Sequence, residues 1–424
     1  MSLKDHLEKN KEFLKDNFVL FIGIFILNFL GYLFHFYVGR KLGPEDYGVF
    51  GSLLSLIYII AMPLSAIQTT ITNFAANFKA RGELGKISYL LKRSLEKFFI
   101  IGIITFVLFL IAIPFISKFL KIDSYTPLVI LAFFLILSLF IPIIRGVLQG
   151  LQEFKLLGWS YIFEGIAKLV TGVGLIALGF GVSGAIGGFT LSYLFAILIT
   201  IYFIRKYFRK DKVKFKSNNI YKYSLPVLIM LIFLTGIYTI DILLIKHFFD
   251  ETNSGYYAAL SLLGKIIFFG TLSISMVMFS KVSENFAKNK EDIKLLYKSL
   301  LLVAIMGFSI TGFYFLFPKF TISMLFGSQY FAMSGLLGLY ALFITIFSLV
   351  YIIGFYNISA NRNKFIYLLA IFNILEAGLI TLYHESLLQV VIILLALVIV
   401  LFISLMIYTI IKNEKGNNIN SSVQ

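Results

Sequence analysis

Hydrophobic residues occur along this chain in runs of about 20, separated by short polar breaks, from residue 18 to residue 411. An α-helix rises about 1.5 Å per residue, so each run is long enough to cross the ~30 Å hydrocarbon core of a bilayer. A helix also satisfies its own backbone hydrogen bonds, which a segment surrounded by lipid must do. The pattern therefore predicts an all-α polytopic membrane protein.

About twelve transmembrane helices are predicted. They cover residues 18–38, 47–72, 98–116, 127–151, 159–180, 183–204, 223–248, 255–280, 299–317, 332–357, 365–383 and 387–411. The composition agrees, because 59% of the residues are hydrophobic and only 14% are charged, whereas about a quarter of the residues in soluble domains are charged. A soluble globular protein is excluded on both counts.

The net charge of +16 raises the question of nucleic-acid binding, which the placement of the charges answers. Most Lys and Arg residues lie in the two tails and in the breaks after every second span, and this is the positive-inside pattern. We therefore expect a multi-pass protein of the cell (plasma or inner) membrane with both termini in the cytoplasm. Its basic loops would contact membrane lipids and no nucleic acid. Residues 4–16 are charged, and we expect the first span to be a retained helix, not a cleaved signal peptide.

The most basic break divides the chain almost in half. We predict an N-terminal six-helix bundle at residues 1–204, a basic cytoplasmic linker at 205–222 and a C-terminal six-helix bundle at 223–424. Residues 77–89 and 285–297 share several residue types at one fixed offset, which favours an internal repeat. Two parallel bundles around a central cavity are typical of secondary transporters.

Motifs for enzyme chemistry are absent from the sequence. It has no cysteine, no phosphate-binding glycine loop and no zinc-protease motif, and its four histidines are far apart. We therefore predict that the protein is not an enzyme, binds no metal at a structural site and uses no organic cofactor. Work would then come from a gradient, with Na⁺ or H⁺ as the candidate coupling ion.

Ionisable residues inside the spans are the candidates for function, because a charge at membrane depth costs at least ~2.5 kcal/mol and usually faces a cavity or a partner. Glu164 and Lys168 are four residues apart with the acid first, the spacing that favours an intrahelical ion pair. Arg145 and Lys265 have no acid at helical spacing in their own spans. Their partners must come from elsewhere: Asp241, Glu164 or an anionic substrate.

We accordingly predict three substrate-binding residues and three ion-coupling residues in the spans. The cations Arg145, Lys265 and Lys168 would contact substrate, while Asp241, Glu376 and Glu164 would couple transport to an ion. For each acid the alternative is a structural pair with a cavity cation. For Arg145 the alternative is an anchor to lipid head groups.

Other polar and aromatic residues in the spans have structural interpretations. Amides such as Gln68, Asn357 and Asn373 are expected to form interhelical hydrogen bonds. Three tyrosines are placed as an external aromatic belt would require, namely Tyr47, Tyr256 and Tyr257.

Four segments resemble a known family. They are GRKLGPEDYGVFGSLLSL at residues 39–56, RGVLQGLQEFKLLG at 145–158, YSLPVLI at 223–229 and DILLIKHFFDETNSGYYAALSLLGK at 241–265. In this order they resemble the polysaccharide-transporter, or Wzx-like, flippases. That family belongs to the superfamily that also contains the multidrug and toxin extrusion exporters and the lipid II flippases.

The resemblance implies two six-helix bundles and the movement of lipid-linked oligosaccharides, on a polyprenyl phosphate or pyrophosphate carrier, from the cytoplasmic to the outer leaflet. Such an anionic head group suits a cavity with Lys and Arg. The resemblance also implies a fourth substrate-binding residue, Arg40, at the outer end of the first span where the family motif begins; its alternative role is in topology or as an anchor to lipid head groups. Glycan polymerases or glycosyltransferases are the implied partners. Two alternatives stay open: a cation-coupled multidrug exporter of the same fold, and a non-transporting scaffold of a glycan-synthesis complex. The chain lacks the two additional spans of lipid II flippases, which argues against peptidoglycan precursors.

Overall fold

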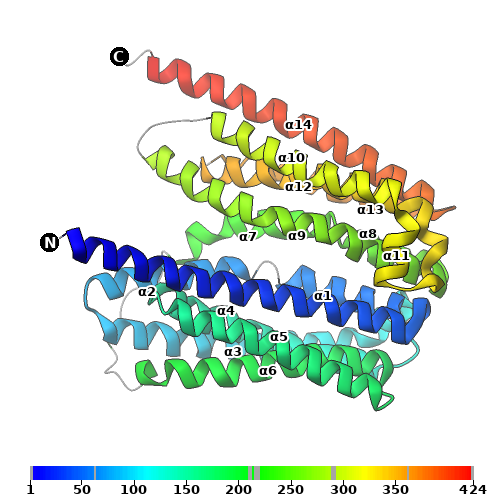
Figure 1. The fold of residues 1–424 in the computed structure, drawn as a ribbon, viewed down its shortest axis with the longest axis horizontal. Helices are drawn as coiled ribbons and strands as arrows, with labels where there is room; N and C mark the ends of the chain where they lie inside the picture. The colour runs from blue at the N-terminus through cyan, green and yellow to red at the C-terminus, as the bar shows by residue number, and fades with distance from the viewer. Residues whose placement is uncertain are drawn as a thin grey trace. The chain divides into compact units, whose positions relative to one another are not determined.

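The computed structural model describes residues 3–61, 64–208, 213, 220–287, 293–360 and 362–421. The regular structure in these ranges is helical throughout, with no strand (Figure 1). Ten helices among the described residues are long and apolar enough to cross a membrane. One of them, Val19–Ala80, contains the first two predicted spans, and the shorter apolar helix Ile366–Leu382 matches the eleventh. The prediction of an all-α multi-pass membrane protein with about twelve spans is confirmed.

Backbone contacts divide the chain into two compact units. The first comprises Met1–Leu42 and Leu56–Leu225, and the second comprises Gly43–Ser55 and Pro226–Gln424. The sequence did not suggest that Gly43–Ser55 belongs with the C-terminal helices. Most of the predicted basic linker, residues 209–212 and 214–219, lies outside the described residues.

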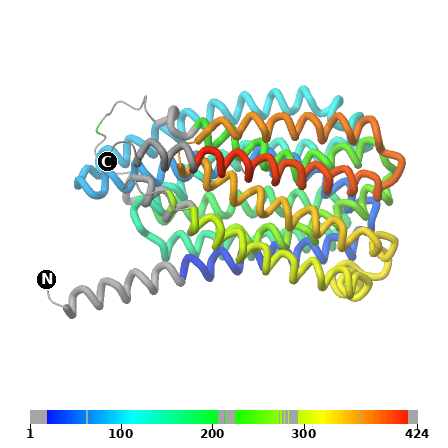
Figure 2. Tube along the Cα trace, turned by 90° about the horizontal axis from the view of Figure 1, so that it is seen from above, coloured from blue at the N-terminus to red at the C-terminus, as the bar shows by residue number. Residues whose placement is uncertain are grey.

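The first unit is built from the N-terminal part of one long helix and from five further helices. These are α1 (Leu3–Ala61), α2 (Ser65–Ala80), α3 (Leu84–Leu120), α4 (Thr126–Gly150), α5 (Phe154–Ala177) and α6 (Gly181–Phe208). Helix α4 packs against α2, α3 and α6, and α5 runs along α6. Figure 2 shows the spanning helices of each unit running side by side. Only 11% of the most apolar stretch of α3 is buried, as expected of a lipid-facing helix.

Small residues bring α2 and α4 into close contact. A Cβ atom on Gly150 would lie 2.5 Å from the carbonyl oxygen of Thr72, so only glycine fits there. The Thr72 hydroxyl donates to the carbonyl of Gly146 at 3.2 Å. Gln68 Nε2 donates to Gln149 Oε1 at 2.9 Å, which confirms the interhelical hydrogen bond predicted for Gln68. Close backbone approach and side-chain hydrogen bonds are the usual means of helix association in lipid.

Glycines also line the face of α5 that meets α1. Gly158, Gly165 and Gly172 are seven residues apart and therefore lie on one helix face. A Cβ on Gly158 would lie 2.8 Å from the carbonyl oxygen of Val19, and one on Gly172 would overlap the ring of Phe34. These glycines let α1 lie directly on α5, which places the polar residues of α5 in the interior of the unit.

The second unit contains Gly43–Ser55 of α1 and the remaining helices from Pro226 of α7 onward. The helices are α7 (Ile220–Gly236), α8 (Ile240–Phe248), α9 (Glu251–Ala287), α10 (Ile293–Leu316), α11 (Pro318–Leu325), the 3₁₀ turn η1 (Ser328–Met333), α12 (Ser334–Ser359), α13 (Ile366–Leu382) and α14 (Leu387–Ser421). Helix α12 packs against α9, α10 and α14 and is largely buried. Its Asn357 donates to Thr409 of α14 at 2.7 Å, confirming another predicted interhelical hydrogen bond.

Helix α1 bends at Gly43, and the residues after the bend pack on α9. Gly43 has φ 80° and ψ 178°, a backbone conformation essentially restricted to glycine. A Cβ on Gly48 would lie 2.9 Å from the amide nitrogen of Gly255. The ring of Tyr47 contacts those of Phe326 and Tyr330 and is buried. The prediction that Tyr47 belongs to an external aromatic belt is therefore wrong, because this close packing encloses its ring.

The predicted span 223–248 is two helices in the structure. Helix α7 ends at Gly236 and α8 begins at Ile240, with turns between them. Asn373 of α13 braces this break, since its Nδ2 donates to the carbonyl of Phe233 at 3.0 Å. A Cβ on Gly236 would overlap Asn373 Oδ1. The predicted hydrogen bond of Asn373 is thus confirmed, and the break places Asp241 in the first turn of α8.

We predict that Gly255→Ala destabilises the protein, because the new Cβ would overlap the carbonyl oxygen of Pro44. Overpacking of this kind costs about 1–3 kcal/mol. The detergent-purified protein is heated, and the height of its monodisperse size-exclusion peak is measured. The temperature at which this peak falls to half should be lower by several degrees in the variant. Gly312→Ala in α10 is the control, since its Cβ would meet no atom within 4 Å. Equal stability of the two variants would contradict the packing described here.

Candidate functional site

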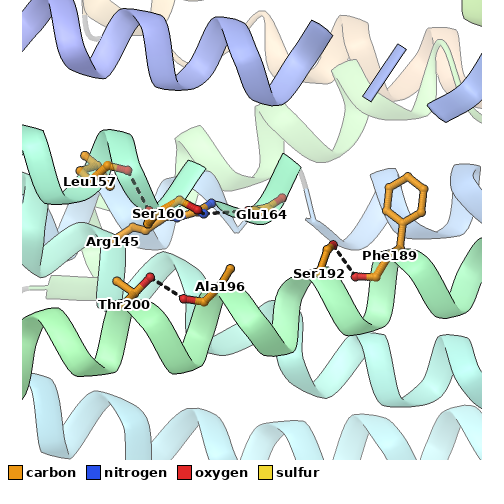
Figure 3. A network of polar contacts seen from close by, with 8 residues as sticks. All are labelled: Arg145, Leu157, Ser160, Glu164, Phe189, Ser192, Ala196 and Thr200. Atoms are coloured by element: carbon orange, nitrogen blue, oxygen red, sulfur yellow. Dashed lines mark hydrogen bonds and ion pairs between the residues drawn. The ribbon is translucent and has the colours of Figure 1, made fainter. Parts of the chain in front are cut away.

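The first polar cluster lies inside the first unit and centres on an ion pair between helices. Arg145 of α4 places an Nη atom 2.7 Å from Glu164 Oε2 of α5. Their side chains are only 5% and 4% exposed. Figure 3 shows Arg145 reaching toward Glu164 and Ser160. The expectation that the partner of Arg145 comes from another span is met by one of its predicted partners, Glu164.

Two further kinds of contact hold the guanidinium group. Arg145 Nε donates to Ser160 Oγ at 3.1 Å, and an Nη donates to the Ser160 carbonyl at 3.1 Å. The Ser160 hydroxyl in turn donates to the carbonyl of Leu157 at 2.8 Å, as Figure 3 shows. The ring of Tyr161 lies 4.0 Å from Arg145 Cζ. The geometry is therefore fixed by the backbone of α5 as well as by its carboxylate.

Lys168 does not form the predicted ion pair with Glu164. The ion pairs found between described residues include Arg145–Glu164 but not Glu164–Lys168. Lys168 Nζ instead lies 4.5 Å from the ring of Phe189 on α6, within the electrostatic influence of Glu164 and Arg145. The prediction of an intrahelical pair is wrong, because the planar guanidinium of Arg145 binds the carboxylate while also hydrogen-bonding Ser160.

The charges of this cluster do not balance. Arg145, Lys168 and Glu164 are all buried, and together they carry two positive charges and one negative charge. A charge inside a membrane protein usually has a partner or faces a water-filled path. The cluster is consequently a place where an anion would be stabilised, with the Lys168 ammonium as the group least engaged by protein oxygen atoms.

The second polar cluster lies inside the second unit and centres on Asp241. Its Oδ2 accepts hydrogen bonds from the hydroxyls of Tyr257 at 2.7 Å and Tyr340 at 3.1 Å. Its Oδ1 accepts one from the amide of Ile242 at 2.8 Å. Tyr257 is fully buried, so the prediction that it belongs to an external aromatic belt is wrong. Its hydroxyl is needed where a carboxylate is removed from water.

Lys265 and Glu376 complete this cluster. Lys265 of α9 is buried, attracts Asp241 electrostatically and has its Nζ 5.3 Å from the ring of Tyr238. Glu376 of α13 is 2% exposed, and its Oε1 has no hydrogen-bond partner. Glu376 and Asp241 would repel each other if both were ionised. Here two acids accompany one lysine, so the balance of charge is the reverse of that in the first cluster.

The remaining predicted site residue, Arg40, differs from the other six because it is exposed, near the Gly43 bend of α1. The structure thus groups Arg145, Glu164 and Lys168 in one unit and Asp241, Lys265 and Glu376 in the other, with the roles of all seven still predictions. No group of three His, Cys, Asp or Glu residues suited to a metal ion occurs in the described part of the chain.

Sequence reasoning missed several partners of these residues. Ser160 and Tyr161 lie four and three residues before Glu164, so helical spacing was a usable signal for them. Tyr340 is 99 residues from Asp241, and nothing in the local sequence links the two. Lys246 lies inside a predicted span and is 1% exposed. It attracts Asp46, and its position in the span should have marked it as buried.

The fold is shared with solved transporters. An inward-facing multidrug resistance MATE family transporter of the MOP superfamily superimposes with a TM-score of 0.77 at 12% identity, covering 93% of this chain and 96% of that one. A MOP superfamily transporter from Pyrococcus furiosus, reported for the reverse polarity of its binding pocket, gives a TM-score of 0.63 at 15% identity, with coverages of 93% and 95%. At these identities the likeness shows only that the fold is shared.

The family follows from the sequence. Residues 13–286 match the polysaccharide biosynthesis protein family, and the chain belongs to this family. An uncharacterized membrane protein of Methanocaldococcus jannaschii is 25% identical over 312 residues, 68% of this chain and 70% of that protein. Stage V sporulation protein B of Bacillus subtilis is 26% identical over 218 residues, 48% of this chain and 40% of that protein. The resemblance to polysaccharide transporters of the MOP superfamily is confirmed.

We predict that Arg145→Gln destabilises the protein far more than Arg145→Gln combined with Glu164→Gln. The single change leaves a buried carboxylate without its cation, which costs about 3–5 kcal/mol, whereas the double change removes both charges. Thermal unfolding in detergent measures the difference. Arg93→Gln is the control, because the exposed Arg93–Glu96 pair at 3.7 Å should contribute little. A double variant as unstable as the single one would show that the pair is not the source of stability.

Proposed function

We propose that this protein is a flippase that moves lipid-linked oligosaccharides from the cytoplasmic to the outer leaflet by alternating access. The observation that carries the proposal is the excess positive charge buried in the first cluster, where Arg145 is bound to Glu164 and Lys168 is not. Membership of the polysaccharide biosynthesis protein family supplies the class of substrate.

The chemistry of the head group fits this arrangement. A phosphate or pyrophosphate carries negative charge and accepts charge-assisted hydrogen bonds from Lys and Arg. Because Arg145 already binds Glu164 and Ser160, Lys168 is the cation that we expect to contact the head group first. Lys265 shares its environment with Asp241 and would contact substrate later in the cycle. The apolar carrier chain would stay in the lipid.

The proposal includes the setting in which the protein works. It places the protein in the cell membrane with both termini in the cytoplasm, acting without catalysis and without an organic cofactor. Glycan polymerases or glycosyltransferases would supply or use its substrate. Asp241, Glu376 and Glu164 are the proposed ion-coupling residues, with H⁺ or Na⁺ as the ion.

Reconstituted vesicles test the proposal. Purified protein in proteoliposomes is given a fluorescent lipid-linked oligosaccharide, and efflux of a cationic dye is followed in the same vesicles. We expect flipping of the glycolipid without dye efflux. Dye efflux alone would assign the protein to multidrug export. If neither activity is seen with any of several lipid carriers, a scaffold of a glycan-synthesis complex is favoured.

We predict that Lys168→Gln lowers the rate of flipping by roughly 10- to 100-fold, since a hydrogen bond to a charged group contributes ~1.5–3 kcal/mol. Lys168→Arg should retain most of the activity. Lys155→Gln is the matched control, because Lys155 lies on the same helix but is exposed. Full activity of Lys168→Gln, with normal insertion, would remove Lys168 from the binding site.

A further inference from the structure

The two acids of the second cluster have very different surroundings. Asp241 Oδ2 accepts from two tyrosine hydroxyls and Oδ1 from a backbone amide, with Lys265 nearby. Hydrogen bonds donated to a carboxylate, and a neighbouring cation, stabilise its ionised form. Each of these neighbours therefore favours the ionised form of Asp241.

Glu376 has none of this support. Its Oε1 has no hydrogen-bond partner, although the side chain is 2% exposed. It faces a small pocket whose other lining residues are all apolar: Ile237, Phe343, Phe372, Leu394, Leu397, Val398 and Leu401. The cavity volume is about 10 Å³, close to the least that admits one water molecule. A bare carboxylate in such surroundings is costly, whereas a neutral acid is far less so.

The charged and titratable groups near Glu376 strengthen this contrast. From α8, Asp241 contributes a negative charge, and from α9 and α12 the hydroxyls of Tyr257 and Tyr340 are directed at Asp241. Lys265 of α9 attracts Asp241. Helix α14 contributes only Leu and Val to the pocket. A second negative charge on Glu376 would be opposed by the first on Asp241.

We propose that Glu376 is an exchangeable proton site, that Asp241 is a fixed carboxylate beside it, and that loading of this site acts on the break between α7 and α8. The exchange is simple: the Glu376 carboxylate takes a proton from hydronium in the pocket, leaving water, and returns it to water when the site empties. The role in coupling rests on the proposed transport function, but the proton site does not.

The break between α7 and α8 contacts the Glu376 site both through its own residues and through α13. Ile237 belongs to the residues between α7 and α8 and lines the Glu376 pocket. Asn373, one turn before Glu376 on α13, donates to the Phe233 carbonyl just before the break. Asp241 stands in the first turn after it. Loss of the proton would create repulsion between α13 and the start of α8. The residues between α7 and α8 form turns, in which the amides of Tyr238 and Thr239 donate to carbonyls three residues back.

Infrared spectroscopy of the full-length protein in detergent tests the assignment without any substrate. The carbonyl stretching band of a protonated carboxylic acid is followed while pH is varied. We expect a titrating band in the wild type and in Asp241→Asn, and its loss in Glu376→Gln. Glu385→Gln is the control, because Glu385 is an exposed acid just after α13 and its removal should leave the buried band unchanged.

The outcomes separate the possibilities. Loss of the band in Asp241→Asn but not in Glu376→Gln would overturn the assignment, because the proton would then belong to Asp241. Loss of the band in both variants would also overturn it, because the proton would then be shared. If Glu376→Gln does not fold, Glu376→Asp must shift the band, and an unshifted band would also overturn it. In vesicles, Glu376→Gln should flip glycolipid with no pH dependence. If the wild-type protein shows the Glu376 band but flips no glycolipid, the proton site is supported and the flippase proposal is rejected.

Discussion

A charged or hydrogen-bonding group in a bilayer must find its partners within the protein, because the surrounding hydrocarbon offers none. This constraint shapes both units. In the first, Arg145 is held by Glu164, by Ser160 and by the ring of Tyr161. In the second, Asp241 is held by two tyrosine hydroxyls and a backbone amide.

The two clusters have opposite balances of charge. The first holds two cations and one acid, and the second holds two acids and one cation. The proposed roles follow this contrast, with an anionic head group proposed for the first cluster and a proton for the second. Membership of the polysaccharide biosynthesis protein family supports the proposed class of substrate.

The spans were predictable from the sequence because hydrophobic length alone decides whether a helix crosses a membrane. The hydrogen bonds of Gln68, Asn357 and Asn373 were predictable for a similar reason, since an amide in lipid has few alternatives. The choice of partner was less accessible. Glu164 had a lysine at ideal helical spacing and binds an arginine from another helix instead, and Tyr257 has the position of an interfacial residue but binds Asp241. Such choices depend on helix packing, which local periodicity does not record.

The placement of Gly43–Ser55 in the second unit has a consequence for how the chain is assembled. Glu45 accepts a hydrogen bond from Thr252, a residue 207 positions later. The segment therefore leaves the ribosome long before the helix on which it packs, and it must wait in the membrane without that partner. Contacts of such long separation slow folding. If the chain were cut in the basic linker, the C-terminal fragment would lack Gly43–Ser55, a piece of its own unit.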